Sequence, residues 1–269
     1  MEMDTQKLAK RIRAHAVRMV HQAGASHIGS ALSIADLLAV LYGEHLRIRV
    51  NEPQWEHRDR FLLSKGHAVT ALYATLAESG FFPVQELDSY GMDGSRLIGH
   101  VSHHVPGIEF STGSLGHALP VACGMALASK REQRPERFVV LLGDGELDEG
   151  SIWEAALFAP QHQLDNLTVI IDNNNIQSFG SVEQILNLAP LADKWKAFRW
   201  RIQEIDGHDH RQISQALASL PFSPGSPSVI LAHTVKGKGV GFMENELAWH
   251  YKSPNAAQLE QAIREIEAN

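Results

Sequence analysis

The stretch FVVLLGDGELDEGSIWEAALFAPQHQLDNLTVIIDNNN (138–175) decides the fold. Its two short, wholly apolar runs, FVVLL (138–142) and LTVII (167–171), are typical of strands that are buried on both faces of a parallel sheet. Between them, the capping-box pattern SIWE (151–154) predicts the start of a helix that runs to about His162. A strand, a loop, a helix and a second strand form a βαβ unit. The stretch therefore predicts an α/β protein with a mostly parallel sheet and helices on both of its faces.

The same alternation continues more weakly along the rest of the chain. WRIQEI (200–205) and SVILAHT (228–234) are further expected strands, with a helix over 211–219 between them. The pattern SIAD (33–36) resembles a second capping box at the start of a helix that ends at Gly43. Other helices are expected at 4–21, 67–80, 119–130, 188–198 and 255–269.

The chain is expected to form a single domain over residues 1–269. Residues 81–118 are rich in Gly, Ser, Pro and His and show little periodicity, which indicates long loops of the kind that are usually functional. PFSPGSP (221–227) is typical of a turn and not of a linker, because too little chain follows it to build a second core. The sequence contains no internal repeat and no low-complexity tract.

The composition excludes several classes of protein. The chain has 269 residues, of which 44% are hydrophobic, so it can bury a large core and disorder is not expected. Its formal net charge of −7 argues against a nucleic-acid partner, which would require a basic face. The apolar run 138–142 is far shorter than the roughly 20 residues that cross a bilayer, and the N-terminus lacks the apolar core of a signal peptide.

Cys123 is the only cysteine, so an internal disulfide is excluded. It stands among small apolar residues, which predicts a buried, inert thiol, and a reduced cytoplasm fits this cysteine usage best.

Asp144 and Asn174 stand where two neighbouring strands of the predicted sheet end. They are 174 − 144 = 30 residues apart, which is one βαβ unit. Ligands of open parallel sheets bind at the carboxyl ends of the strands, so both side chains can converge on one point. Gly143 and Gly145 let the backbone pass close to a ligand. The helix that begins near Ser151 directs its positive end toward the same region, which favours an anion.

A carboxylate, an amide oxygen and a bound anion match the hard oxygen ligands of Mg²⁺. The neutral asparagines would complete the metal shell without adding charge that repels a bound diphosphate. By itself, GDG (143–145) is a weak motif that more often marks a surface turn, and an asparagine run can merely cap a strand. The combination of the two at one βαβ spacing favours the metal and phosphate site.

GDG followed one βαβ unit later by NN resembles the signature of thiamine-diphosphate enzymes, and the version in this chain is similar to that of transketolase. The resemblance covers nearly the whole chain. Four further segments are similar to transketolase motifs in the same order: ASHIGSALSIADLLAVLY (25–42), FLLSKGHA (61–68), GHVSHHVPGIEFSTGSLGHAL (99–119) and HTVKGKGVGFMENELAWH (233–250). Five segments in the right order make the resemblance highly specific.

The resemblance implies roles for particular residues. Asp144, Asn174 and the backbone carbonyl of Ile176 are expected to hold Mg²⁺ or Ca²⁺. The diphosphate of the cofactor is expected to contact Gly145 and His67. Backbone groups of Gly113 and Leu115 are expected to face the cofactor, and Gly143 belongs to the same cofactor-binding set.

Three histidines, His27, His100 and His250, are expected to line the channel to the reactive carbon and to contact the sugar hydroxyls. The resemblance also implies that Glu149 reaches across a dimer interface into a proton relay; a plain helix-terminal acid is the alternative interpretation. Two other histidines, at 103 and 104, match no motif and are expected on the surface. The acidic residues at 146 and 148 are expected in a solvated loop.

The chain also departs from the transketolase pattern. Ile28 and Val101 replace prolines that usually follow the motif histidines, and Lys65 stands where alanine or asparagine is more common. Ser114 and His117 replace the proline and glutamine of the T-G-P-L-G-Q loop. None of these departures removes an expected ligand, but they leave the preferred sugars open.

The resemblance finally implies a partner. In transketolases a second, pyrimidine-binding domain supplies the glutamate that activates thiamine diphosphate, and this chain ends just after its closing motif. The pyrimidine-binding and C-terminal domains are therefore expected on a partner chain, the C-terminal transketolase subunit, in a heterotetramer. The expected reaction moves a two-carbon ketol unit from a ketose or its phosphate to an aldose or its phosphate.

Three alternatives stay open at this point. The chain could belong to another thiamine-diphosphate enzyme, such as a deoxyxylulose-phosphate synthase or the α-subunit of a 2-oxo acid dehydrogenase. It could be a non-enzymatic relative that keeps the fold and supports a partner. It could also be a general α/β phosphate-binding module.

Overall fold

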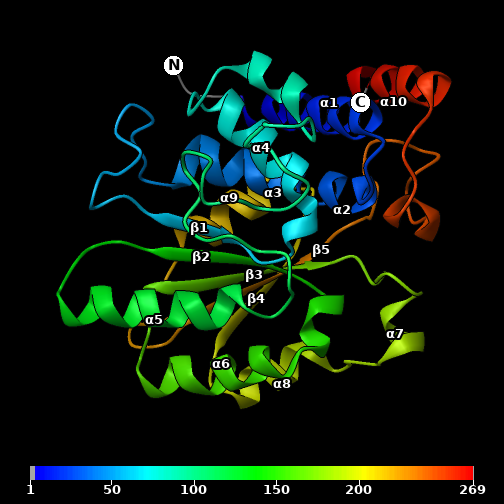
Figure 1. The fold of residues 1–269 in the computed structure, drawn as a ribbon. Helices are drawn as coiled ribbons and strands as arrows, with labels where there is room; N and C mark the ends of the chain where they lie inside the picture. Colours follow the sequence, from blue (N-terminus) through cyan, green and yellow to red (C-terminus); the bar gives the residue numbers. More distant parts are fainter. Residues whose placement is uncertain (1–3, 269) are drawn as a thin grey trace.

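The computed structural model describes residues 4–268, which form a three-layer α/β domain (Figure 1). The central sheet has five strands in the order β1-β2-β3-β5-β4, and all of the neighbouring strands are parallel. The strands are β1 (Arg60–Leu63), β2 (Phe138–Gly143), β3 (Leu167–Asn173), β4 (Arg201–Asp206) and β5 (Ser228–His233). The predicted parallel sheet is confirmed.

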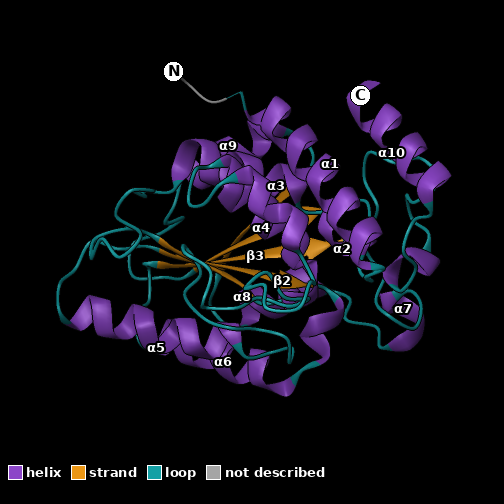
Figure 2. Ribbon diagram, turned by 45° about the horizontal axis from the view of Figure 1, so that its top comes forward, coloured by secondary structure: helices purple, strands orange, loops and turns teal. Residues whose placement is uncertain are grey.

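Helices cover both faces of the sheet, as Figures 1 and 2 show. One layer contains α1 (Thr5–Ala23), α2 (Ile28–Leu32), α3 (Ala35–Val40), α4 (Val69–Glu78), α9 (His210–Ala218) and α10 (Ala256–Ala268). The other contains α5 (Ala118–Arg131), α6 (Gly150–Gln161) and α8 (Leu191–Ala197). Shorter turns of helix are η1 (Leu41–His45), η2 (Gly66–Ala68), η3 (Val84–Ser89), η4 (Gly145–Asp148), α7 (Val182–Ile185) and η5 (Leu247–His250).

The apolar strands explain why the helices pack on both sides. Alternate residues of a strand point to opposite faces, and in β2 Val139 and Leu141 belong to the core beneath α1, α3, α4 and α9. Val140 and Leu142 belong to the second core, beneath α5, α6 and α8. Trp195 of α8 is fully buried in this second core. Because both faces are covered, the polar side chains of the central strands can gather only at the strand ends.

The two capping-box predictions are wrong in detail. Helix α3 begins at Ala35, and the Ser33 hydroxyl donates a hydrogen bond to Asp172 at 2.7 Å and does not cap the helix. Helix α6 begins at Gly150 with Glu149 as the residue before it, and the Ser151 hydroxyl donates to the Gly116 carbonyl at 2.8 Å. In both places tertiary contacts take the hydroxyl that a local pattern assigns to the helix.

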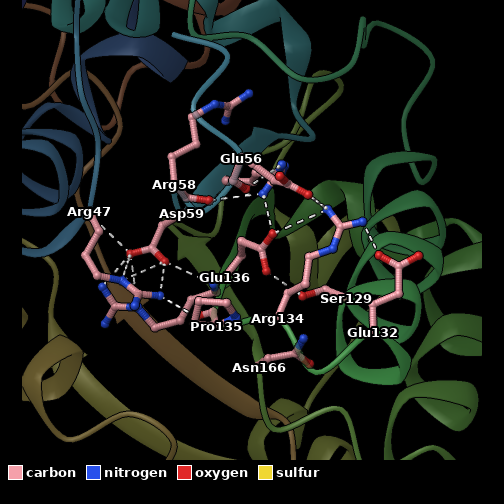
Figure 3. A network of polar contacts seen from close by, with 12 residues as sticks. Arg47, Glu56, Arg58, Asp59, Ser129, Glu132, Arg134, Pro135, Glu136 and Asn166 are labelled. Atoms are coloured by element: carbon pink, nitrogen blue, oxygen red, sulfur yellow. Dashed lines mark hydrogen bonds and ion pairs between the residues drawn. The ribbon is translucent and has the colours of Figure 1, made fainter. Parts of the chain in front are cut away.

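An ionic network joins the amino ends of β1 and β2 (Figure 3). Asp59, whose side chain is fully buried, accepts hydrogen bonds from the Nη2 atoms of Arg47 and Arg137 at 2.7 and 2.6 Å. It also accepts from the backbone N–H groups of the same two residues at 2.9 and 3.0 Å. Although burial alone would raise it, these bonds lower the pKa of Asp59 below its ordinary value. The network holds the loop before β1 against the start of β2.

Two further expectations concern the rest of the chain. Cys123 is buried in α5 as predicted, and burial raises the pKa of its thiol to about 12. None of the helices between residues 4 and 268 combines the length and the apolar character that a bilayer crossing requires.

Candidate active site

A cleft of about 250 Å³ opens at the carboxyl ends of β2 and β3. Most of the residues singled out from the sequence line it: His67, Leu115, Gly143, Asp144, Gly145, Glu149, Asn174, Ile176 and His250. The remaining three, His27, His100 and Gly113, lie next to these residues. The His27 ring is 4.9 Å from the rings of both His67 and His250, and a Cβ atom on Gly113 would meet the His100 ring at 3.3 Å. The structure thus brings all twelve together.

Asp144 connects the loop after β2 to the loop after β3. It is buried, and its Oδ1 atom accepts a hydrogen bond from the Gly145 N–H at 2.7 Å. Its Oδ2 atom accepts from the Asn175 N–H at 2.5 Å. Burial and the neighbouring charge of Asp172 raise the pKa of Asp144 to about 7. A carboxylate held this way gains from any cation that replaces its lost hydration.

Two more oxygen atoms face the same region. The Asn174 Oδ1 atom accepts a hydrogen bond from the Ile176 N–H at 3.1 Å, and the Asn174 Nδ2 atom donates to Asp172 at 2.9 Å. The Ile176 carbonyl accepts from the Lys236 ammonium at 2.8 Å. A carboxylate, an amide oxygen and a backbone carbonyl form a hard oxygen donor set that fits Mg²⁺ or Ca²⁺.

Within residues 4–268, no three His, Cys, Asp or Glu side chains are grouped so that they could hold a metal ion. A metal in this cleft would therefore depend on the amide and carbonyl oxygens and on a phosphate group, which is typical of Mg²⁺.

Two buried lysines place ammonium groups in the cleft. Lys65 donates to Asp172 at 2.5 Å and to the Ser30 carbonyl at 3.0 Å. Lys236 is fully buried, and burial together with the charge of Lys65 lowers the pKa of Lys236 to about 8. Two ammonium groups in one cleft with a metal-type oxygen set fit a diphosphate group, whose charge they would offset.

The four motif histidines form one cluster of rings. His67 and His250 are 5.5 Å apart between ring centres, and His27 lies 6.3 Å from His100. Burial and nearby positive charge lower the pKa of His27 to about 4 and that of His250 to about 3, and hold that of His67 well below its ordinary value. These three rings are therefore neutral at physiological pH, so each can donate or accept one hydrogen bond per nitrogen.

The surroundings of two histidine nitrogens bear on the chemistry of the cleft. The Lys236 ammonium is 2.9 Å from the Nδ1 atom of His250, and an ammonium can only donate. His250 therefore carries its proton on Nε2. The His27 Nδ1 atom is buried and has no hydrogen-bond partner among the described residues, which marks a place for a ligand or water group.

Close backbone approach explains the glycine of the turn after Asp144. A Cβ atom on Gly145 would lie 2.6 Å from the Cβ atom of Gln177, which is too close for any side chain. Glycine at this position lets the loop after β3 close over the loop after β2. Glu149 is exposed at the first residue before α6, where it borders the mouth of the cleft.

The expectation that the residues at 146 and 148 lie in a solvated loop is wrong for Glu146. Its side chain is buried, and it accepts hydrogen bonds from Ser64 and from the backbone N–H groups of Gly116 and Gly143, the last two at 2.9 and 3.1 Å. Asp148 is half-buried and lines the cleft. His103 and His104 are exposed, as expected.

Sequence reasoning gave no role to Lys236 or Asp172, and it recorded Lys65 only as a departure. Asp172 carried a signal, because it is a charged residue in a strand that is mostly apolar and buried on both faces. Lys236 carried one as well, because it is the lysine of the T-x-K-G-x-G pattern in the closing segment.

Helices cover both faces of the parallel sheet, and the ends of its strands carry a set of oxygen donors and two lysines. These features define a domain that binds a diphosphate-containing cofactor. The family model described as "Transketolase, thiamine diphosphate binding domain" matches residues 4–266. The chain therefore belongs to the transketolase family and carries its thiamine-diphosphate-binding domain.

Curated relatives match this chain over nearly their whole length. One of them, a subunit of the apulose-4-phosphate transketolase from Phocaeicola vulgatus, is 42% identical over 99% of this chain and 93% of its own. The 6-deoxy-6-sulfo-D-fructose transketolase subunit SqwG from Clostridium sp. is 41% identical over 99% of this chain and 97% of its own.

Longer transketolases match only in part. The chain is 37% identical to rat transketolase and covers 43% of that protein. The crystal structure of Campylobacter jejuni transketolase superposes with a TM-score of 0.92 at 30% identity, over 99% of this chain and 43% of that one. These matches favour transketolase over the other thiamine-diphosphate enzymes that the sequence left open.

Proposed function

We propose that this chain is the N-terminal, diphosphate-binding subunit of a two-subunit transketolase. The enzyme transfers a two-carbon ketol unit from a ketose or its phosphate to an aldose or its phosphate. The observation that carries the proposal is the grouping of Asp144, Asn174, the Ile176 carbonyl and Lys236 in one cleft at the strand ends. Family membership supports the reaction class.

Asp144, Asn174 and the Ile176 carbonyl would hold Mg²⁺ or Ca²⁺ together with the diphosphate of the cofactor. The Asn174 amide supplies an oxygen without adding a negative charge beside the phosphates. Binding of the ion also compensates the buried Asp144 carboxylate, whose ionisation is otherwise unfavourable.

Thiamine diphosphate supplies the carbanion-stabilising chemistry that breaks and forms the carbon–carbon bond. The chain would bind its diphosphate through His67, the backbone at Gly145 and the Lys236 ammonium. Backbone groups of Gly113 and Leu115 would contact the rest of the cofactor. Gly143 belongs to the same turn, and a Cβ atom there would approach Lys65 at 3.3 Å.

His27, His100 and His250 would hydrogen-bond the substrate hydroxyls. His250 can donate from Nε2, because its Nδ1 atom is occupied by Lys236. His27 can use the Nδ1 atom that has no partner among the described residues. A neutral imidazole can donate one hydrogen bond and accept another, so it can orient a hydroxyl group without adding charge to the cleft.

A C-terminal subunit with a pyrimidine-binding domain would complete the site. Support comes from the relatives that are named as transketolase subunits, which match this chain over nearly their whole length, and from Glu149, which is exposed at the mouth of the cleft. We infer a heterotetramer in which Glu149 reaches the proton relay of a neighbouring subunit. The single buried cysteine supports a reduced, cytoplasmic setting.

The test combines this chain with its C-terminal subunit in a coupled assay that compares ketose phosphates with pyruvate as donors. Ketol transfer from a ketose phosphate is expected only with both subunits, thiamine diphosphate and Mg²⁺. Asp144→Ala should remove the activity, whereas Asp193→Ala, a control that removes an exposed carboxylate on α8, should not. Full activity of the chain alone, or of the complex with Asp144→Ala, would contradict the proposal.

A further inference from the structure

Asp172 is the most enclosed acidic residue next to the cleft, and the proposed function gives it no role. It is the last residue but one of β3 and is completely buried. Four side chains from four separate segments donate hydrogen bonds to its carboxylate. They are the Lys65 ammonium at 2.5 Å, the Ser33 hydroxyl at 2.7 Å, the Asn174 amide at 2.9 Å and the Thr234 hydroxyl. We call these five residues the Asp172 cluster.

The Asp172 cluster joins segments that each lead into the cleft. Lys65 lies two residues before His67, and Thr234 lies two residues before Lys236. Asn174 lies two residues after Asp172 itself, in the loop that carries the expected metal ligands. The carboxylate therefore contacts the parts of the chain whose relative positions decide the geometry of the site.

The contact with Asn174 has a specific chemical consequence. An amide side chain has one end that donates and one end that accepts, whereas an ionised carboxylate only accepts. Asp172 must therefore face the NH₂ group of Asn174, which turns the Asn174 oxygen away from Asp172. The Asn174 Oδ1 atom indeed accepts from the Ile176 N–H at 3.1 Å, and both residues line the cleft.

We propose that Asp172 is a positioning residue that orients Asn174, so that its oxygen and not its NH₂ group faces the metal position. The proposal rests on the metal site of the proposed function and extends it to a residue that would touch neither metal nor cofactor. Residues of this kind, which hydrogen-bond a metal ligand but do not touch the metal, typically contribute about 10- to 100-fold to metal affinity.

Asp172→Asn tests the proposal with the smallest change of shape. An asparagine at this position can face either end of Asn174, so the orientation is no longer imposed. The Mg²⁺ concentration that half-saturates thiamine diphosphate binding, measured by calorimetry on the complex of the full chain with its C-terminal subunit, should rise about 10- to 100-fold. Thr234→Val is the matched control, because it removes a different hydrogen bond from the same carboxylate. It should change the Mg²⁺ requirement by less than about threefold.

A rescue variant separates orientation from general damage. In Asp172→Asn combined with Asn174→Asp, both terminal atoms at position 174 are oxygens, so orientation no longer matters. The Mg²⁺ requirement of this double variant should be lower than that of Asp172→Asn alone. Failure of this rescue, or an unchanged Mg²⁺ requirement in folded Asp172→Asn, would overturn the proposal.

A measurement on the unsubstituted chain covers the case in which Asp172→Asn does not fold. The Asn174 side-chain NH₂ signal, assigned by its loss in Asn174→Asp, should exchange with solvent far more slowly than an exposed amide. Exchange at the exposed rate would overturn the proposal. If the complex of the unsubstituted chain with its C-terminal subunit bound no thiamine diphosphate with Mg²⁺ although this NH₂ group were protected, the proposed function would fail and the orientation by Asp172 would stand.

Discussion

The affinity of the chain for magnesium thiamine diphosphate should depend on pH through two buried groups of opposite effect. Asp144 binds a cation only when it is ionised, and burial raises its pKa to about 7. Lys236 attracts a diphosphate only when it is protonated, and burial lowers its pKa to about 8. Below the pKa of Asp144, protonation of this carboxylate weakens cofactor binding. Above the pKa of Lys236, deprotonation of the ammonium group weakens cofactor binding. The affinity should therefore pass through a maximum between the two values.

The size of the effect follows from the ionised fractions. Asp144 is about 9% ionised at about pH 6, so the affinity there should be about sixfold lower than at about pH 7.5, where both groups are mostly in their binding states. On the alkaline side, loss of a charge-assisted hydrogen bond of about 1.5–3 kcal/mol lowers the affinity roughly 10- to 100-fold. The buried motif histidines add nothing in this range, because the pKa values of His27 and His250 lie near 4 and 3.

Isothermal titration with magnesium thiamine diphosphate across this pH range measures the profile, after correction for protonation of the ligand in a titration without protein. Lys236→Met should remove the alkaline decrease and keep the acidic one. Lys238→Met, a control that removes a partly exposed lysine two residues away, should keep both. A flat profile between about pH 6 and 8, or an alkaline decrease that persists in Lys236→Met, would refute this assignment of the two groups.

Three further predictions address other parts of the chain. Asp59→Ala should lower the free energy of unfolding by about 2 kcal/mol in urea titrations. This loss is smaller than for a fully buried ion pair, because the side chains of Arg47 and Arg137 are 45% and 37% exposed. A loss below about 0.5 kcal/mol would contradict a stabilising role of the network. Gly145→Ala should lower the free energy of unfolding by about 1–3 kcal/mol and weaken cofactor binding, because the added Cβ atom would clash with Gln177. An unchanged melting temperature together with unchanged binding would disprove this prediction. Cys123 should react with iodoacetamide at least about 100-fold more slowly in the folded chain than in urea, and equal rates would show an accessible thiol.

The parallel sheet and the approach of Asp144 to the asparagine loop could be predicted from the sequence, because both depend on strand spacing. Two apolar runs fix two buried strands, and parallel strands bring their carboxyl ends to one edge. In the structure Asp144 and the N–H group of Asn175 are hydrogen-bonded. The metal and cofactor roles of these residues stay predictions.

Tertiary contacts that have no local pattern could not be predicted. Ser33 and Ser151 each begin a pattern that resembles a helix cap, yet their hydroxyls bind Asp172 and Gly116. Glu146 lies in a glycine-bracketed turn that looks solvated, and its burial depends on three donors from elsewhere in the chain. Local patterns describe which partners are near in sequence, and these side chains are bound by partners that are distant in sequence.

The ionic network around Asp59 lies at the amino edge of the sheet, and the cleft lies at the carboxyl edge. The six residues of β2 span about 20 Å between these two edges. A fluorescent label or a surface tether attached near Arg134, in the turn before β2, would therefore leave the mouth of the cleft open to solution. Immobilised chain oriented in this way could capture its partner chain and small-molecule ligands without steric interference from the support.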